Sequence, residues 1–157
     1  MKRKILTLMC VLAVTVCSLC ACFGAVDEAG KVTVVVENRD GSYKEYKANL
    51  EDIENKDEGA VGVIEHLAAR SDDPLEADLQ DSSYGKFVNS IGGLVPDASA
   101  GEFVSIYTSV EADFGTFDGV GEINYNGTTL KSAGVGLTSM QVLEGTVILF
   151  RIEVSSW

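Results

Sequence analysis

All four cysteines of this 157-residue chain lie within its first 22 residues, at positions 10, 17, 20 and 22. The remainder of the chain has no thiol and can form no disulfide. Any fold there must be held together by its own apolar core, and a chain of this length can bury enough surface to do so. The length suits one domain and is short for two. We therefore expect a single domain that packing alone stabilises.

The first 21 residues have the pattern of a secretory leader. Lys2, Arg3 and Lys4 precede an uncharged, mostly apolar run from Ile5 to Ala21, which matches the basic and apolar regions of a signal peptide. The run is short for a membrane span, which needs about 20 apolar residues. An uncleaved anchor is the alternative at this margin.

The end of this leader resembles a bacterial lipobox. Leu19 stands three positions before Cys22, and the small residue Ala21 stands directly before it. Cys20 instead follows Leu19, which is too bulky for a peptidase that selects small residues beside the bond it cleaves. The sequence therefore predicts that Cys22 receives the lipid and becomes the N-terminus of the mature chain.

This interpretation divides the chain into a lipoprotein signal peptide over 1–21, a tether over 22–30 and a domain over 31–157. We expect a protein that is lipid-anchored in the cell membrane and faces outside the cytoplasm. Loss of the leader removes three basic residues and leaves 9 basic against 24 acidic side chains. The body should therefore stand away from an anionic membrane surface, tethered by acyl chains.

Charge and composition also argue against several kinds of function. The net charge of −12 at pH 7 is unsuited to the phosphates of nucleic acid, which bind basic surfaces. His66 is the only histidine and has no cysteine partners for a zinc set, and the spacing of an EF-hand calcium loop is absent. We expect no nucleic acid partner, no metal site and no catalytic activity, and the sequence indicates no particular cofactor.

Local patterns in the first half predict a hairpin and a helix. Residues 32–36 are almost all β-branched, residues 38–41 have turn chemistry and residues 43–48 are strand-like in composition. Apolar residues then recur at helical spacing over 61–68, which predicts one helix. The acidic stretch over 72–83 predicts a solvated loop or a frayed extension of that helix.

The second half holds 11 of the 16 glycines and nine of the 12 aromatic residues, and it predicts further strands. From Phe103 onward, alternation places Val104, Ile106 and Val110 on one face of a strand. The same alternation places Phe103 and Tyr107 together on the other face.

Two further patterns complete the predicted sheet. Asn126 and Gly127 stand between strand-like runs over 122–125 and 128–131, and such a pair is typical of a tight hairpin because both residues adopt positive φ. Residues 146–154 alternate between apolar and charged side chains, which predicts a strand that closes the sheet.

Four short segments, over 59–67, 84–93, 103–107 and 143–148, follow the first hairpin in a specific order. Together with the lipobox, this order resembles the transcobalamin-like C-terminal domain of bacterial surface lipoproteins, a domain of unknown function. The resemblance covers most of residues 31–154. It implies an α+β fold in which a β-grasp-like mixed sheet holds one main helix.

In the vertebrate vitamin B12 carriers the similar domain closes over one side of a corrinoid, so the resemblance makes a corrinoid one option. Two departures argue against it. In the family a tryptophan and an Asn-Gly turn usually follow the Ser-Ile-x-Gly segment closely. Here Phe103 stands near the tryptophan position, and Asn126 with Gly127 comes after an insert over 111–121.

Aromatic side chains of the second half are the candidate ligand-binding residues, because rings with polar tips are typical of small-ligand sites. Phe87 is expected in the core instead. Two of the candidates lie in the glycine-rich insert, where exposed rings would need a partner. The candidates are Tyr84, Phe103, Tyr107, Phe114 and Phe117, and the alternative is that they pack in the core.

We therefore expect a cell-surface binding module that captures a small molecule or cofactor. The face of Phe103 and Tyr107 would form the wall of its site, and the insert over 111–121 would form the rim. The alternative is a structural or protein-interaction module without a small-molecule ligand. The expected partners are the membrane, through the N-terminal lipid, and either a small molecule or a surface protein.

Overall fold

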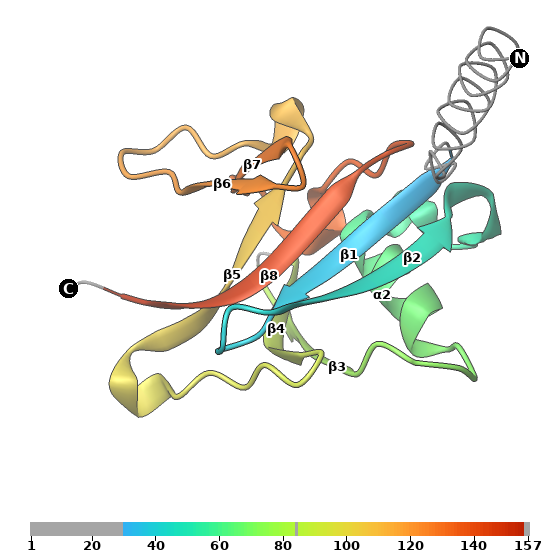
Figure 1. Ribbon diagram of the computed structural model, residues 1–157. Coiled ribbons are helices and arrows are strands. Elements are labelled where there is room, and N and C mark those ends of the chain that lie inside the picture. Colours follow the sequence, from blue (N-terminus) through green and yellow to red (C-terminus); the bar gives the residue numbers. More distant parts are fainter. Residues whose placement is uncertain (1–29, 84, 156–157) are drawn as a thin grey trace, which may run out of the picture.

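The computed structural model describes residues 30–83 and 85–155 (Figure 1). The predicted leader, Cys22 and Tyr84 lie outside the described residues. No helix in the described part is both long and apolar enough to cross a membrane. The main elements, labelled as in Figure 1, are β1 (Lys31–Glu37), β2 (Tyr43–Asn49), α2 (Ala60–Ala68), β3 (Ala77–Ser82), β4 (Gly85–Ile91), β5 (Glu102–Thr108), β6 (Glu122–Tyr125), β7 (Thr128–Ser132) and β8 (Val147–Val154).

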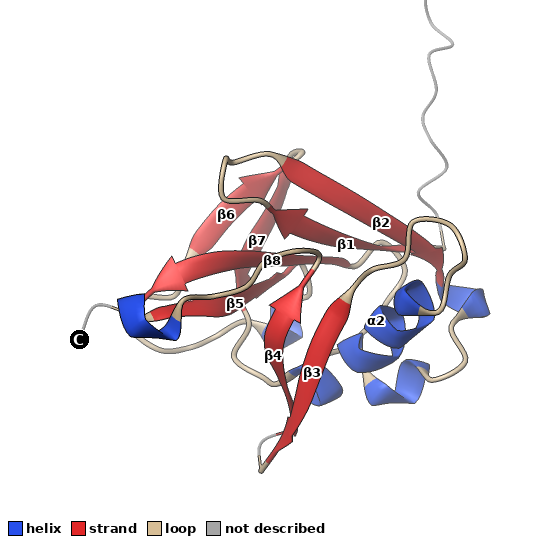
Figure 2. Ribbon diagram, turned by 90° about the horizontal axis from the view of Figure 1, so that it is seen from below, coloured by secondary structure: helices blue, strands red, loops and turns tan. Residues whose placement is uncertain are grey.

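The described residues form a mixed α+β domain with two sheets and one α-helix. The large sheet has six strands in the order β2-β1-β8-β5-β7-β6, and β3 pairs with β4 in a separate two-stranded sheet. Strand β1 runs parallel to β8, whereas the other neighbouring strands are antiparallel. Helix α2 and the β3–β4 hairpin lie together on one side of the large sheet (Figure 2).

The main core lies between the large sheet and α2. Val32, Val34 and Val36 are fully buried on this side of β1, because alternate side chains of a strand share a face. Ile64 and Leu67, three residues apart on α2, belong to the same buried cluster and face the sheet together. The helix is therefore held by its apolar stripe.

The opposite face of the large sheet, here called the curled face, has a second and smaller buried cluster. Tyr125 on β6 reaches across it: its hydroxyl donates a hydrogen bond to Glu45 on β2, and its ring meets Tyr43 edge-on with 5.2 Å between centroids. Because β2 and β6 are the outermost strands, the sheet curls until its two edges meet over this face (Figure 2). The cluster consists of Val35, Tyr107, Tyr125, Leu130 and Leu149.

The structure confirms the elements that the sequence predicts from local patterns. The β1–β2 hairpin, helix α2 and strand β8 form at the expected places. The β6–β7 hairpin turns at Asn126 and Gly127, which have φ of 48° and 83°. These are the positive values that a tight hairpin turn of this kind requires.

Three expectations are wrong in detail. The sequence predicts a loop over 72–83, but residues 77–82 form β3, because pairing with β4 overrides the acidic composition. Phe87, expected in the core, is 55% exposed on β4, since Val88 and Ile91 face the core instead. Val110 does not extend the strand face, because β5 ends at Thr108.

Candidate ligand-binding site

The candidate site is on the curled face, beside the first half of β5. Strand alternation places Phe103, Ser105 and Tyr107 on this face, and it places Val104 on the side of the main core. Phe103 is 38% exposed, whereas Tyr107 is 3% exposed. The two rings therefore share a face but differ in their surroundings.

A hollow of about 460 Å³, here called the β5 hollow, lies between this strand, the 111–121 insert and the loop after β7. Three large apolar side chains that border it are exposed: Phe103 by 38%, Phe117 by 57% and Val135 by 36%. They come from three separate segments, so the fold brings them together. The lining residues are Phe103, Val104, Ser105, Ile106, Tyr107, Phe117, Gly119, Gly121, Ser132, Ala133, Val135 and Glu153.

Polar groups gather at one side of the β5 hollow. The hydroxyl of Tyr107 donates a hydrogen bond of 2.6 Å to Oε1 of Glu153, and the backbone N–H of Gly121 donates to Oγ of Ser132 over 3.1 Å. Burial, followed by the hydrogen bond to Glu153, raises the pKa of the Tyr107 hydroxyl. The carboxylate and the hydroxyls supply the few directional contacts that a mostly apolar ligand site needs.

The insert lies close against these groups because it has glycine where a side chain would collide. A Cβ at position 121 would lie 2.2 Å from the hydroxyl of Tyr107 and 2.9 Å from Oγ of Ser132. A β-carbon there would push the insert away from β5. Gly121 therefore sets the width of the β5 hollow at its polar side.

The structure separates the five candidate aromatic residues. Phe103, Tyr107 and Phe117 line the β5 hollow, but Tyr107 also packs in the cluster on the curled face. Phe114 is half-buried elsewhere in the insert, where its ring lies 5.6 Å from Nζ of Lys131. Tyr84 lies outside the described residues.

The sequence reasoning missed Val135, Ser132 and Glu153, which also line the β5 hollow. Glu153 alternates with apolar residues on β8, so the sequence could have placed it on the same face of the sheet as Phe103. No sequence pattern places Val135 and Ser132 beside β5, because they reach it only through the pairing of β7.

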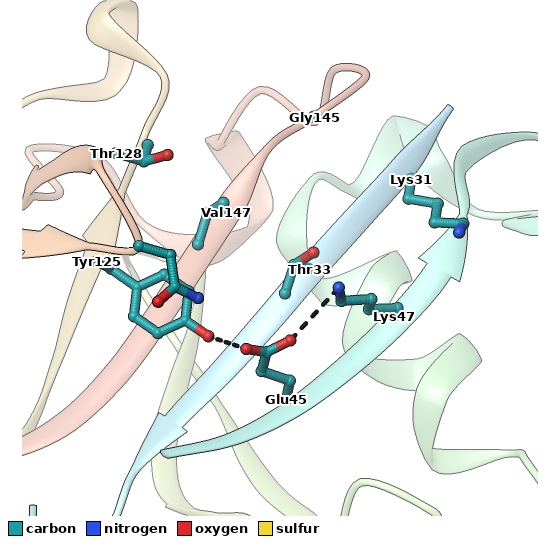
Figure 3. A pocket seen from close by; sticks show the side chains of 9 residues that line it. Lys31, Thr33, Glu45, Lys47, Tyr125, Thr128, Gly145 and Val147 are labelled. Carbon is teal, nitrogen blue, oxygen red and sulfur yellow. Dashed lines mark hydrogen bonds and ion pairs between the residues drawn. The ribbon is translucent and has the colours of Figure 1, made fainter. Parts of the chain in front are cut away.

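A second hollow of about 270 Å³ lies farther along the curled face, between the β1–β2 and β6–β7 hairpins (Figure 3). Figure 3 shows Tyr125 pointing across it to Glu45, whose other oxygen lies 3.4 Å from Nζ of Lys47. Burial and the hydrogen bond to Glu45 raise the pKa of the Tyr125 hydroxyl. This hollow is more polar, and its central residues already contact one another.

Metal-binding chemistry has little support within the described residues. They contain no group of three or more histidine, cysteine, aspartate or glutamate side chains placed to hold a metal ion. His66 is half-buried on α2, beside Glu65 and apolar residues of the helix.

Comparison with known proteins gives a likeness of fold. No family model and no curated protein matches the chain. Among solved structures, a candidate metal-binding protein from Ruminococcus gnavus matches with a TM-score of 0.52 and 13% identity, over 80% of this chain and 97% of that one. Haptocorrin in complex with Cbi matches with a TM-score of 0.46 and 13% identity, over 77% of this chain and 24% of that one. At such low identity, the first match shows that this chain shares its fold with the Ruminococcus gnavus protein.

Proposed function

We propose that this protein is a lipid-anchored, extracytoplasmic binding module without catalytic activity, which captures a small, largely apolar molecule in the β5 hollow. The observation that carries the proposal is the convergence of Phe103, Phe117 and Val135 on one hollow while they remain exposed. Contiguous exposed apolar side chains are typical of binding surfaces. The membrane anchor is supported by Leu19 and Ala21 before Cys22.

The size and chemistry of the β5 hollow suit a small ligand. Its volume of about 460 Å³ lies within the range of about 300–1,000 Å³ that such sites occupy. Phe103 and Phe117 offer ring faces, and Glu153, Tyr107 and Ser132 offer hydrogen-bonding groups at one side. The proposal adds that the domain is a β-grasp-like, transcobalamin-type module, supported by the order of its segments.

Neither solved relative identifies the ligand. The Ruminococcus gnavus protein is a candidate metal-binding protein, and the described residues of this chain contain no group of three or more histidine, cysteine, aspartate or glutamate side chains placed to hold a metal ion. Phe103 stands near the position where the family has a tryptophan, and this departure argues against a corrinoid. We therefore propose the ligand by its chemistry, as an apolar molecule with at least one hydrogen-bond donor for the Glu153 carboxylate.

A protein-interaction module is the second candidate function, and one observation favours it. Phe87 is 55% exposed on β4, in the small sheet that lies away from the β5 hollow. An exposed ring on a two-stranded sheet suits contact with another protein. Phe87 therefore provides both the alternative and a matched control for Phe103.

The experiment compares ligand capture by three proteins with native mass spectrometry. The unaltered chain, the double variant Phe103→Ala with Phe117→Ala, and the variant Phe87→Ala are each incubated with the same cell extract. We expect a small-molecule adduct on the unaltered chain and on Phe87→Ala, and its loss from the double variant. An adduct that persists on the double variant, or none on any of the three, contradicts the proposal.

A further inference from the structure

Strand β5 is paired along its whole length on one side and only at its end on the other. On the first side, β8 pairs with β5 from Glu102 to Thr108. On the other side, β7 pairs only with Tyr107 and Thr108. Before Ile106, β5 therefore has no partner strand among the described residues on this side, its open edge, and only the N–H of Glu102 is bonded there, to the carbonyl of Asp97 over 3.1 Å.

The hydrogen bonds around β5 show which backbone groups face this open edge. The N–H of Ser109 donates to Val147 over 3.0 Å, so odd-numbered residues point towards β8. The carbonyl of Ile106 instead accepts from the N–H of Ala133 over 2.8 Å, on the side away from β8. Since backbone direction alternates along a strand, the N–H and C=O of Val104 also point away from β8. No other described residue pairs with Val104 there.

This open edge borders the β5 hollow. Val104 and Ile106 are among the lining residues, although their side chains face the main core side of the sheet. A chain laid along this edge would satisfy the backbone of Val104 and place alternate side chains beside Phe103 and Phe117.

We propose that the open edge of β5 binds an extended peptide as an added strand, and that this peptide combines apolar with basic residues. The inference rests on the proposed function, because it uses the β5 hollow, and it goes beyond it, because a peptide with basic residues is a second class of ligand beside the small, largely apolar molecule proposed above. Strand addition takes its affinity from main-chain hydrogen bonds and its specificity from alternate side chains. The stretch of β5 between Glu102, whose N–H donates to Asp97, and Ile106, whose carbonyl accepts from Ala133, is three residues long. At about 3.3 Å per residue it spans about 10 Å, so the peptide would add a short strand centred opposite Val104.

The negative charge of the protein favours a peptide with basic residues as the ligand at this edge. The chain has 24 acidic against 12 basic residues, so a second copy pairing at this edge would bring two acidic bodies together. Asp118 is exposed in the insert beside Phe117, and Glu153 lines the β5 hollow. These carboxylates attract a basic peptide and disfavour an acidic one.

The test measures binding of fluorescent hexapeptides to the full chain by anisotropy. The first peptide alternates lysine and valine. The second has the same sequence with the amides of its four central residues methylated, so that none of these four residues can donate a backbone hydrogen bond from either edge. The third replaces each lysine by glutamate. We expect the first peptide to bind, and each of the other two to bind at least tenfold more weakly.

Two further measurements locate the bound peptide. Phe103→Ala should weaken binding of the lysine–valine peptide at least fivefold, whereas Phe87→Ala should leave it unchanged. Hydrogen exchange at the Val104 amide should slow when that peptide is bound. Equal binding of the methylated peptide, or unchanged exchange at Val104, overturns strand addition. If no peptide binds while the small-molecule adduct still depends on Phe103 and Phe117, this inference is overturned and the proposed function stands.

Discussion

At the scale of single residues, Tyr107 takes part in both the core and the candidate site. Its ring is packed among Val35, Leu130 and Leu149, while its hydroxyl reaches Glu153 at the side of the β5 hollow. Alternation along β5 indicates the face on which Tyr107 lies. It cannot indicate that the β6–β7 hairpin covers that face near Tyr107 and leaves it open near Phe103.

The first prediction compares the loss of stability when three aromatic side chains that differ in burial are each replaced by alanine. Phe150 is fully buried, so Phe150→Ala should lower the free energy of unfolding by about 3–5 kcal/mol. Tyr107→Ala should cost about 3 kcal/mol, because that ring is also buried. Phe103→Ala should cost about 1 kcal/mol or less. Urea unfolding midpoints measure all three, and equal losses would show that Phe103 belongs to the core.

The second prediction concerns the ion pair between Arg39 and Glu102. Oε2 of Glu102 lies 2.6 Å from the guanidinium and accepts a hydrogen bond of 2.7 Å from the backbone of Asp97. The hydrogen bonds from Arg39 and from the Asp97 backbone lower the pKa of Glu102 to about 2, from 4.5. A carboxyl whose pKa is lowered by folding stabilises the folded protein above pH 4.5. That contribution is lost as the pH falls towards about 2.

The measurement is a double-mutant cycle of Arg39→Met and Glu102→Gln by urea unfolding at several pH values. The two substitutions should show coupling at pH 7, and the coupling should shrink between pH 4.5 and pH 2. The double variant is the control, because it lacks both charges. Coupling that is already lost at pH 4.5 would contradict the lowered pKa.

At the scale of elements, the sequence predicts what local patterns determine. The β1–β2 and β6–β7 hairpins and α2 follow from turn residues and from periodicity, and each is in place. Strand β3 could not be predicted, because its acidic composition resembles a loop and only its pairing with β4 makes it a strand. The curl of the sheet depends on Tyr125 meeting Glu45, 80 residues apart, and no local pattern contains it.

In the candidate site, too, some features follow from local sequence patterns and others depend on the pairing of distant strands. Phe103 could be chosen from the sequence because strand alternation places it opposite the apolar face of Val104 and Ile106, and Phe117 because it lies in a glycine-rich insert. The open edge of β5 could not be predicted from the sequence, because it arises where β7 stops pairing at Tyr107. The length and the direction of a neighbouring strand are properties of the whole sheet.

The third prediction concerns the turn of the β6–β7 hairpin. Gly127 has φ of 83°, and a Cβ there would meet no atom within 4 Å. Gly127→Ala should therefore cost only backbone strain, about 1–2 kcal/mol in the free energy of unfolding. Asn126→Gly tolerates the same turn and should be nearly neutral, which makes it the control. Urea midpoints decide, and an unchanged midpoint for Gly127→Ala would contradict the turn geometry.

At the scale of the whole molecule, an acidic body would be held at a membrane by one lipidated residue. The fourth prediction is that Cys22→Ala abolishes labelling by a fatty-acid analogue and moves the protein out of the membrane fraction. The reason is that Ala21 makes Cys22 the cysteine that fits a lipobox. Cys20→Ala is the matched control and should still be labelled. Retention of the Cys22→Ala protein in the membrane would instead favour an uncleaved anchor.

The parallel pairing of β1 with β8 has a consequence for the order in which the protein acquires its structure. The strand that begins at Lys31 is hydrogen-bonded to the strand that ends at Val154, so the middle of the large sheet joins the start of the domain to its end. Such non-local pairing is slow to form, because the intervening chain must close first. While the protein is being synthesised from its N-terminus, β1 has no β8 to pair with. For a chain exported as proposed here, the domain therefore stays incomplete, and able to pass through a narrow channel, until its last strand has been made.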